Sequence, residues 1–346
     1  MLSFLRRLPT CVLSSRVRLA GFCCYDDRAA REGARVLAGF GGSHCRTQHT
    51  EPAGVVEVDL RKLRGEDDGI AEVLMCRHKA RNALGHVFVS QMRALMSVLS
   101  NDDSAVRVLV FRSLVPGVFC AGADLKERAL MDDRESDLFV HGLRGLMTQI
   151  ASLPMPTIAA IDGVALGGGL ELALACDLRT AAYSAQMGLI ETTRGLLPGA
   201  GKTHTLIRTF FPPGGADLEV VLCGTGGSQR LPRTVGITLA KELIFTGKRV
   251  GGRGAMEMGL VNRAVDQNET GDAAYSEALS LAREILPQAP IAVRMAKEAM
   301  NRGTEVDITS AMAIERMCYA QVIPTRDRRE GMAAFIEKRP PRYTGK

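Results

Sequence analysis

Apolar residues in this chain are grouped into short runs that glycine and proline turns separate. Four of these runs are rich in β-branched and aliphatic residues and predict buried strands. They span residues 55–60, 70–76, 106–111 and 157–161. Between the second and third runs, apolar residues from Phe88 to Leu99 recur at helical spacing, which predicts a helix. A further helix is expected over residues 138–153, because Pro154 and Pro156 then end it.

The same order of strand, glycine-rich turn and helix start occurs twice, after residue 111 and after residue 161. Repeated units of this kind predict an α/β core, which we place at residues 51–266. From residue 273 onward, helical patterns follow one another without strand signals. The expected helices span residues 273–285, 291–301, 308–320 and 326–336. They indicate a helical C-terminal module, residues 267–346, whose apolar faces need a partner in the core or in another subunit.

The charge of the chain is concentrated at its N-terminus. Residues 1–50 contain eight arginines and three acidic residues, and so carry +5 of the total charge of +6. The nearly neutral remainder gives no reason to expect nucleic acid or anionic lipid as a partner. No run reaches the roughly 20 uninterrupted apolar residues that a membrane span needs. The composition, with 46% apolar residues among 346, is that of a globular protein.

The first 25 residues combine arginine, serine and interleaved apolar residues with no acidic residue. This composition is typical of a mitochondrial transit peptide, and we assign residues 1–50 to such a leader. The alternative is a disordered basic arm on a cytosolic protein. Nine cysteines without disulfide or metal spacing fit a reducing compartment, such as the mitochondrial matrix.

Two glycine turns are the first candidates for chemistry, namely residues 121–124 and the triple glycine at 167–169. The first N–H groups of a helix have no intrahelical partner, and glycine lets a ligand approach them closely. One N–H group near Ala123 and one near Gly168 are therefore candidates for an oxyanion hole, which is worth around 3 kcal/mol per donor. Alternatively, the glycines only allow tight packing of strand against helix.

Two glutamates lie beside apolar runs near these turns. Glu171 opens an apolar helix after the triple glycine, and Glu191 follows a second apolar run. A buried carboxyl group has a raised pKa, and two of them can hold one water and divide the acid and base roles. Alternatively, Glu171 only caps its helix electrostatically. We interpret Asp124 and Asp177 as structural caps, and we expect no metal site.

The segments around these residues resemble those of the enoyl-CoA hydratase/isomerase (crotonase) superfamily. Residues 119–127 and 163–171 are similar to its two signature segments, and residues 187–200 to its second catalytic segment. Residues 80–84 are similar to its coenzyme A-binding entry, and residues 326–339 to its C-terminal helix. The resemblance runs from about residue 54 to the end.

The resemblance implies a spiral of ββα units with a C-terminal helical trimerisation module, and hence a homotrimer or homohexamer. It also implies that the N–H groups of Ala123 and Gly168 bind a thioester oxygen, and that Glu171 and Glu191 are paired catalytic glutamates. Retention of both points to a hydratase that adds water across the 2,3 double bond of a 2-enoyl-CoA.

Coenzyme A is part of that substrate, so the resemblance implies no separate cofactor. The acyl-CoA would bind along residues 123–126, with Ala80 near the adenine. The residues expected at this binding site are Ala80, Ala123, Asp124, Leu125 and Lys126.

The chain departs from the family pattern in one place. The family run Pro-Gly-Ala-Gly-Gly-Thr-Gln-Arg-Leu-Pro is interrupted after Ala200 and resumes at Gly226, so residues 201–225 are an insertion. Our hypothesis is a retained intron or a gene-model error, because Gly201 and Lys202 can be encoded by a sequence that resembles a splice donor. Residues 198–203 imitate a phosphate-binding loop, but Leu196 stands where that motif needs its first glycine.

Two other functions are considered. One family relative binds AU-rich RNA through a lysine-rich helix, but the corresponding residues 86–100 offer only Arg93 as a firm cation. The other is a catalytically impaired acyl-CoA-binding protein, in which the insertion misplaces Glu191.

Overall fold

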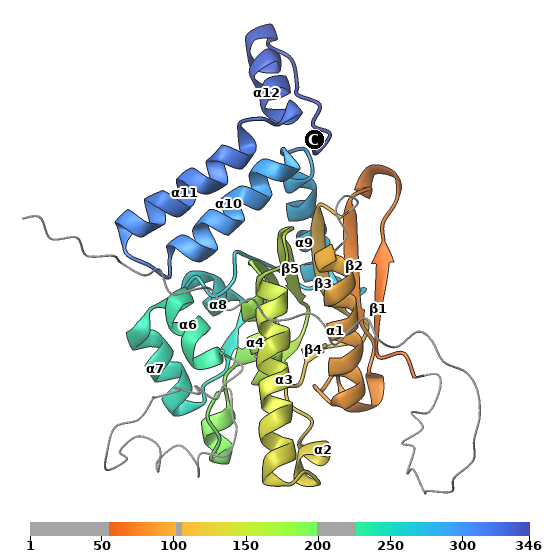
Figure 1. Ribbon diagram of the computed structural model, residues 1–346. Helices are drawn as coiled ribbons and strands as arrows, with labels where there is room; N and C mark the ends of the chain where they lie inside the picture. Colours follow the sequence, from red (N-terminus) through yellow and green to blue (C-terminus); the bar gives the residue numbers. More distant parts are fainter. Residues whose placement is uncertain (1–54, 102–105, 199–225) are drawn as a thin grey trace, which may run out of the picture. The chain divides into compact units, whose positions relative to one another are not determined.

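Two β-sheets form the centre of the computed structural model, which describes residues 55–101, 106–198 and 226–346 (Figure 1). The larger sheet has the order β1-β2-β3-β5-β7-β10, and β1 alone runs antiparallel to its neighbour. The smaller sheet has the order β4-β6-β8-β9, with β9 antiparallel. The strands are β1 (Val58–Lys62), β2 (Ile70–Met75), β3 (Val108–Ser113), β4 (Val118–Cys120), β5 (Thr157–Ile161), β6 (Val164–Leu166), β7 (Leu178–Ala182), β8 (Gln186–Gly188), β9 (Val250–Gly251) and β10 (Arg263–Val265).

Three consecutive units repeat the order of two strands and a helical segment. Strands β3, β5 and β7 begin these units in the larger sheet, and β4, β6 and β8 continue them in the smaller sheet. The prediction of an α/β fold built from ββα units is therefore confirmed. The helical segments are α1 (His86–Asn101), α2 (Leu125–Ala129), α3 (Asp133–Ala151), α4 (Gly168–Ala175), α6 (Gly227–Val235), α7 (Ile237–Thr246), α8 (Gly252–Glu257), α9 (Ala273–Ile285), α10 (Pro290–Gly303), α11 (Ile308–Val322), α12 (Arg326–Glu337), and the 3₁₀ turns η2 (Gly65–Asp67), η3 (His78–Ala80) and η4 (Glu191–Arg194).

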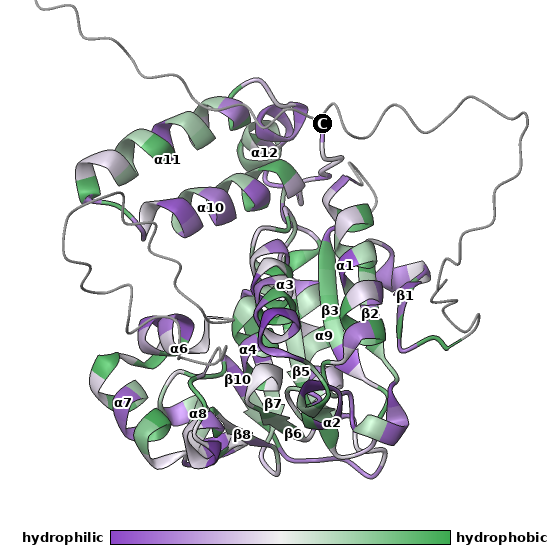
Figure 2. Cartoon of the chain, turned by 60° about the horizontal axis from the view of Figure 1, so that its bottom comes forward, coloured by the Kyte–Doolittle hydropathy of each residue, from purple (hydrophilic) through white to green (hydrophobic). Residues whose placement is uncertain are grey.

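The central strands β2, β3 and β5 of the larger sheet are buried on both faces. Successive side chains of a strand point to opposite faces, so Val108 and Val110 face one side while Leu109 and Phe111 face the other. Helix α9 covers the first side, and α1, α3, α4 and the smaller sheet share the core of the second side. Figure 2 shows the apolar strands enclosed in this way. Burial on both sides explains why these strands appear in the sequence as continuous apolar runs.

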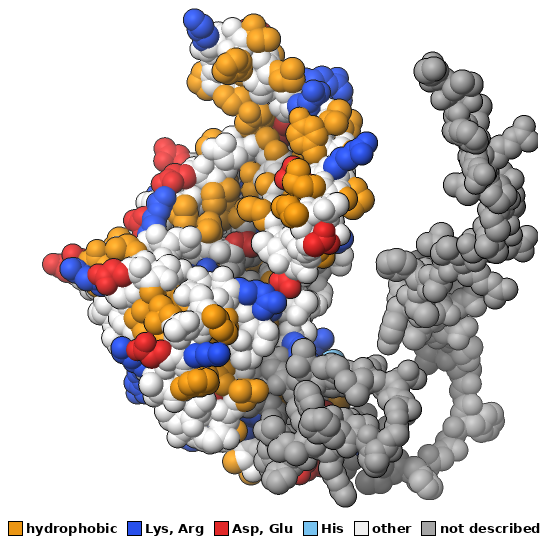
Figure 3. Space-filling view, turned by 90° about the vertical axis from the view of Figure 1, so that its left-hand side faces the viewer, with side chains coloured by type: hydrophobic (Ala, Val, Ile, Leu, Met, Phe, Trp, Pro, Cys, Tyr) orange, Lys and Arg blue, Asp and Glu red, His pale blue; other side chains and the backbone are white. Residues whose placement is uncertain are grey.

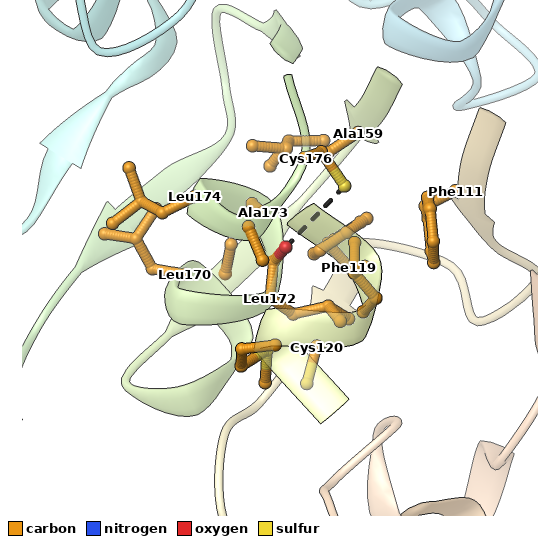
Figure 4. Close-up of a cluster of buried hydrophobic side chains, with 14 of the residues drawn as sticks. Phe111, Phe119, Cys120, Ala159, Leu170, Leu172, Ala173, Leu174 and Cys176 are labelled. Carbon is orange, nitrogen blue, oxygen red and sulfur yellow. Dashed lines mark hydrogen bonds between the residues drawn. The ribbon is translucent and has the colours of Figure 1, made fainter. Parts of the chain in front are cut away.

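Helix α4 is buried along its whole length, and this fixes the position of its first turn. Figure 4 shows Leu172 and Ala173 packed near Phe119, and the Cys176 thiol donating a 3.6 Å hydrogen bond to the carbonyl oxygen of Leu172. Burial raises the pKa of Cys120 and of Cys176 to about 12, so both thiols are protonated and inert at neutral pH. Because α4 is buried along its whole length, a polar side chain in its first turn lies inside the protein.

Two expected elements begin three or more residues away from where they are observed. Strand β1 begins at Val58 and not at residue 55, because Val55 and Val56 precede the pairing with β2 and are exposed. Helix α3 begins five residues earlier than the expected residue 138. Its first turn is polar, and a capping box between Asp132 and Glu135 starts it where the apolar pattern gives no signal. The expected N-terminal leader and the expected insertion lie outside the described residues.

All four expected C-terminal helices are present. Helix α9 packs on the sheet, whereas α10 and α11 lie side by side and α12 follows them (Figure 1). Lys297 of α10 is 8% exposed, and its ammonium group donates hydrogen bonds to Asp177 Oδ2 at 2.7 Å and to the Met155 carbonyl oxygen at 2.9 Å. This contact attaches α10 to the end of α4, because Asp177 directly follows the last residues of that helix.

Helix α12 leaves large apolar side chains in contact with solvent. Phe335 is 85% exposed, and Ile336 and Met332 are also exposed. Figure 3 shows hydrophobic side chains gathered over this region of the molecule. Among the described helices, none has the length and apolar character required to cross a bilayer.

Candidate active site

A cavity of about 130 Å³ lies between the two glycine turns, helices α2 and α3, and the start of η4. Its lining includes Ala123, Gly168, Glu171 and Glu191, so the four residues predicted to act together do lie together. The remaining lining side chains are mostly apolar. They include Leu84, Leu125, Val140, Leu143, Leu166, Ile190 and Leu196.

The two glycine turns pack against each other at this cavity. A Cβ atom at Gly168 would lie 3.7 Å from the backbone nitrogen of Ala123, which shows how close the two turns are. Gly122 has a φ of +100°, and a Cβ atom there would lie 2.6 Å from the Leu166 carbonyl oxygen, so this position requires glycine. Within the described part of the chain, the N–H groups of Ala123 and Gly168 have no hydrogen-bond acceptor. Both amides are therefore available to one oxygen atom of a ligand.

The Glu171 carboxylate is held at the start of α6. Glu171 is 2% exposed, and its Oε1 atom accepts a 2.7 Å hydrogen bond from the N–H of Gly227. The N-terminus of a helix stabilises negative charge. Arg230, one turn further along α6, also interacts electrostatically with Glu171. Burial lowers the pKa of Arg230, and the negative charge of Glu171 opposes that effect.

Glu191 lies on the other side of the same turn. A Cβ atom at Gly167 would lie 2.9 Å from Oε1 of Glu191, and one at Gly168 would lie 3.9 Å from Oε2 of Glu171. Burial and the negative charge of Glu171 raise the pKa of Glu191 to about 7. Its Oε2 atom is buried and has no hydrogen-bond partner within the described ranges. Glu191 can therefore gain or lose a proton near neutral pH, and can bind a water or a ligand.

The other predicted residues have different surroundings. Leu125 lines the cavity, whereas Asp124, Lys126 and Ala80 do not. Asp124 accepts hydrogen bonds from the N–H groups of Lys126 and Glu127, so its interpretation as a structural cap is confirmed. Lys126 is exposed and directly follows Leu125, and Ala80 ends η3.

Asp177 has a structural role, as expected, but it does not cap a helix. Its Oδ2 atom accepts hydrogen bonds from the N–H and hydroxyl groups of Thr157 and from Lys297, so it joins β5 to α10. The acid follows the helix, where its charge would oppose the helix dipole, and the ammonium of Lys297 removes that conflict.

Several residues at the site were not predicted. Arg77 forms ion pairs with Asp124 and Glu127 at 2.8 Å and 2.7 Å, and so fixes α2 next to the first glycine turn. Arg128 and Arg194 line the cavity. No local pattern marks any of these arginines, because their partners are brought close only by the fold. Among the described residues, no group of three or more His, Cys, Asp or Glu side chains is arranged to hold a metal ion.

Comparisons with known proteins agree with the family resemblance seen in the sequence. The family model described as enoyl-CoA hydratase/isomerase matches residues 65–212 and 220–346. The chain is 62% identical to enoyl-CoA hydratase domain-containing protein 2, mitochondrial, of Homo sapiens, over 85% of this chain and 92% of that protein. It is 46% identical to methylglutaconyl-CoA hydratase, mitochondrial, of Mus musculus, over 96% of both.

Among solved structures, an enoyl-CoA hydratase from Bacillus anthracis superposes with a TM-score of 0.72 at 36% identity, covering 84% of this chain and all of the other. The family match, the relatives and the shared fold agree with the repeated ββα units and with the glycine turns that meet at the cavity. The chain therefore belongs to the enoyl-CoA hydratase/isomerase family, within the crotonase superfamily.

Proposed function

We propose that this chain is an enoyl-CoA hydratase that adds water across the 2,3 double bond of a 2-enoyl-CoA. The observation that carries the proposal is the meeting, at one cavity, of two carboxyl groups and two amide N–H groups that have no acceptor among the described residues. The carboxyl groups of Glu171 and Glu191 flank the turn at Gly167 and Gly168. An amide pair suits the developing negative charge of a thioester oxygen, and a carboxyl pair suits transfer of protons to and from water.

The proposed reaction assigns one role to each group. The thioester oxygen accepts hydrogen bonds from the N–H groups of Ala123 and Gly168, so that charge can build up there as C3 is attacked. Glu171, stabilised as a carboxylate by the Gly227 amide, takes a proton from the bound water as the water oxygen bonds to C3. Glu191, whose pKa is raised to about 7, gives its proton to C2. The protons then exchange with solvent and restore the starting state.

The rest of the substrate is coenzyme A, and we propose that residues 123–126 bind it together with Ala80. Lys126 is exposed and directly follows the cavity-lining Leu125, so its ammonium group is available to a phosphate. The cavity itself holds only the reacting part of the molecule, because about 130 Å³ is far below the volume of a whole acyl-CoA.

An assay of crotonyl-CoA hydration tests the proposal. The loss of ultraviolet absorbance of the conjugated thioester measures the rate. We expect the full chain, or the same chain without residues 201–225, to hydrate this substrate. The second form is needed because Gly227, which holds Glu171, comes two residues after the insertion. The alternative is a catalytically impaired acyl-CoA-binding protein, and it is favoured by the closeness of the insertion to Gly227. Binding of crotonyl-CoA without turnover in both forms would support that alternative and refute the hydratase.

We also propose a mitochondrial location, in the matrix, because the similar human and mouse relatives carry mitochondrial names. A homotrimer or homohexamer is proposed as the assembly, since the exposed apolar side chains of α12 need a partner. RNA binding receives no support from α1, where Arg93 is the only lysine or arginine.

A further inference from the structure

The side chain of Arg230 folds back over the start of its own helix, α6. Gly226 precedes this helix with a φ of +105°, and a Cβ atom there would clash with Nη1 of Arg230 and lie 3.1 Å from its Cζ atom. One residue further, a Cβ atom at Gly227 would lie 2.6 Å from Oε1 of Glu171. The guanidinium group and the carboxylate therefore lie against two consecutive glycines, and the second glycine also donates its N–H to the carboxylate.

A positive charge at the start of α6 is unfavourable unless an anion accompanies it. The N-terminus of a helix carries partial positive charge, which repels a guanidinium group. Burial also disfavours the charged form and lowers the pKa of Arg230, and the like charge of Arg233 adds to this effect. The charge of Glu171 opposes it. Cys176 contributes no charge at neutral pH, because the pKa of its thiol is raised to about 12. Among the described residues that act on Arg230, Glu171 thus supplies the compensating negative charge.

The proposed reaction requires the two carboxyl groups to be in different protonation states. Glu171 must take a proton from water, whereas Glu191 must hold a proton that it can give to C2. Two neighbouring carboxyl groups do not both ionise readily, and in equivalent surroundings either of them could hold the proton. Their surroundings differ, because Glu171 has the Gly227 N–H and the charge of Arg230 beside it. Oε2 of Glu191 has no hydrogen-bond partner within the described ranges.

The two cations in the cavity lining do not produce this difference. Arg194 of η4 partly opposes the rise in the pKa of Glu191, so it favours ionisation of the group that must stay protonated. Arg128 of α2 also lines the cavity, and burial is the cause of its lowered pKa. Arg230 is therefore the cation whose charge is coupled to Glu171, although its side chain is not part of the lining.

We propose that Arg230 is a positioning residue that keeps Glu171 in its carboxylate form, and so assigns the base role to Glu171 and the acid role to Glu191. This inference rests on the proposed hydratase function and adds to it a residue that acts through Glu171 without touching the substrate. Because the effect is electrostatic, the pH dependence of the reaction should report it. A purely structural role would lower the rate equally at every pH.

The test compares the pH profiles of crotonyl-CoA hydration by the full chain, Arg230→Met and Arg230→Lys. The profile of kcat/KM should be bell-shaped, because activity needs an ionised Glu171 and a protonated Glu191. In Arg230→Met the acid limb should move to higher pH by about 1 unit or more, since an opposite charge at close range shifts a carboxyl pKa by that amount. The alkaline limb should stay near the pKa of Glu191, about 7. Arg230→Lys keeps the charge and should restore most of the acid limb.

The matched control is Arg233→Met, which removes the same kind of side chain about one turn further along α6. Arg233 is exposed and pairs with Glu305 at 3.3 Å, so its loss should leave both limbs in place. In all variants KM should change little, because none of the altered side chains lines the cavity.

A second measurement does not depend on catalysis. Infrared difference spectra follow the protonation of Glu171 in the chain without substrate, and Glu171→Gln identifies the band by its loss. The midpoint of this titration should be about 1 unit or more higher in Arg230→Met than in the unaltered chain. If Arg230→Met does not fold, as judged by circular dichroism, Arg230→Gln replaces it, since that change also removes the charge.

The two measurements separate the inference from the proposed function. Hydration with an unmoved acid limb in Arg230→Met would overturn the inference and leave the hydratase proposal intact, as would an equal loss of rate at every pH. An equal movement of the limb in Arg233→Met would also overturn it, because the effect would then not belong to Arg230. If the full chain does not hydrate crotonyl-CoA, the infrared midpoint alone decides whether Arg230 keeps Glu171 ionised.

Discussion

The backbone N–H of Gly227 donates a 2.7 Å hydrogen bond to Oε1 of Glu171, a residue that is 56 positions earlier in the chain. This bond joins Gly227, a buried residue in the first turn of α6, to the buried first turn of α4. The position of one of the two paired carboxyl groups therefore depends on where α6 begins. Since α6 begins just after residues 201–225, the length of the chain before it can affect the site without contributing a side chain to it.

Gly227→Ala should reduce the rate of hydration by about 100-fold, since small displacements of a reacting group have effects of that size. A Cβ atom at Gly227 would lie 2.6 Å from Oε1 of Glu171, so the carboxylate must move. The measurement is kcat with crotonyl-CoA. Gly145→Ala is the matched control, because a Cβ atom there meets nothing within 4 Å and the residue lies inside α3. It should keep the rate and raise the stability by about 0.5–1 kcal/mol. An unchanged rate in Gly227→Ala would show that the bond to Glu171 is not needed.

Glu171→Gln and Glu191→Gln should each lower kcat by about 10²–10⁴-fold, while the affinity for coenzyme A esters is largely kept. Glutamine has the same shape as glutamic acid but cannot transfer the proton. Initial rates and equilibrium binding of the same ester provide the two measurements. Glu257→Gln, an exposed position of α8, is the control and should behave like the unaltered chain. Near-normal rates in both variants would rule out the carboxyl pair as the catalytic groups.

Glu191→Gln should also change the stability in a pH-dependent manner. Burial and the charge of Glu171 raise the pKa of Glu191 from 4.5 to about 7 in the folded protein. Between these pKa values the unfolded chain has released a proton that the folded chain keeps, so the stability that this group contributes falls as the pH rises from 4.5 to 7. Relative to the unaltered chain, Glu191→Gln should therefore be more stable at pH 8 than at pH 5 by roughly 1–3 kcal/mol.

Urea unfolding of both proteins at the two pH values measures this difference. Glu257→Gln again provides the control, because its carboxyl group is exposed in α8. The same difference in stability at both pH values would mean that Glu191 titrates normally, and would remove it as the proton donor near neutrality.

The sequence allowed much of this site to be predicted, because its main signals are local. Glycines 167–169 before Glu171 mark a helix start that a ligand can approach, and the apolar runs mark the strands that support it. Arg128 gave no such signal, since an arginine on a five-residue helix looks like a solvated residue until the cavity is seen. The ion pair of Asp177 was not predicted for the same reason, because its partner Lys297 is 120 residues away. Long-range contacts between charged residues leave no periodic pattern in a sequence.

Phe335→Asp should convert the proposed homotrimer or homohexamer into smaller species. Phe335 is 85% exposed on α12, beside the exposed side chains of Ile336 and Met332. Burying such a side chain contributes about 1.5–3 kcal/mol, so an aspartate at this position should weaken association by at least about tenfold per interface. Sedimentation velocity measures the species present. Val98→Asp, an exposed apolar position on α1, is the control and should leave the assembly unchanged. Identical sedimentation of the unaltered chain, Phe335→Asp and Val98→Asp would exclude α12 from the interface.

Lys297→Met should destabilise the folded chain by about 2–4 kcal/mol, near the lower end of the range for breaking a buried ion pair because Asp177 retains some contact with water. The Lys297 ammonium is 2.7 Å from Asp177 and 2.9 Å from the Met155 carbonyl oxygen, and its removal leaves the carboxylate with Thr157 as its remaining partner. The midpoint of urea unfolding gives the loss directly.

Two further variants separate the pair from a general effect of changing α10. Arg302→Met removes an exposed ion pair with Glu298 on the same helix, and should cost less than about 0.5 kcal/mol. The double variant Lys297→Met with Asp177→Asn should regain part of the stability, because no uncompensated charge then remains buried. If Lys297→Met costs no more than Arg302→Met, the attachment of α10 to the end of α4 depends on apolar packing and not on this ion pair.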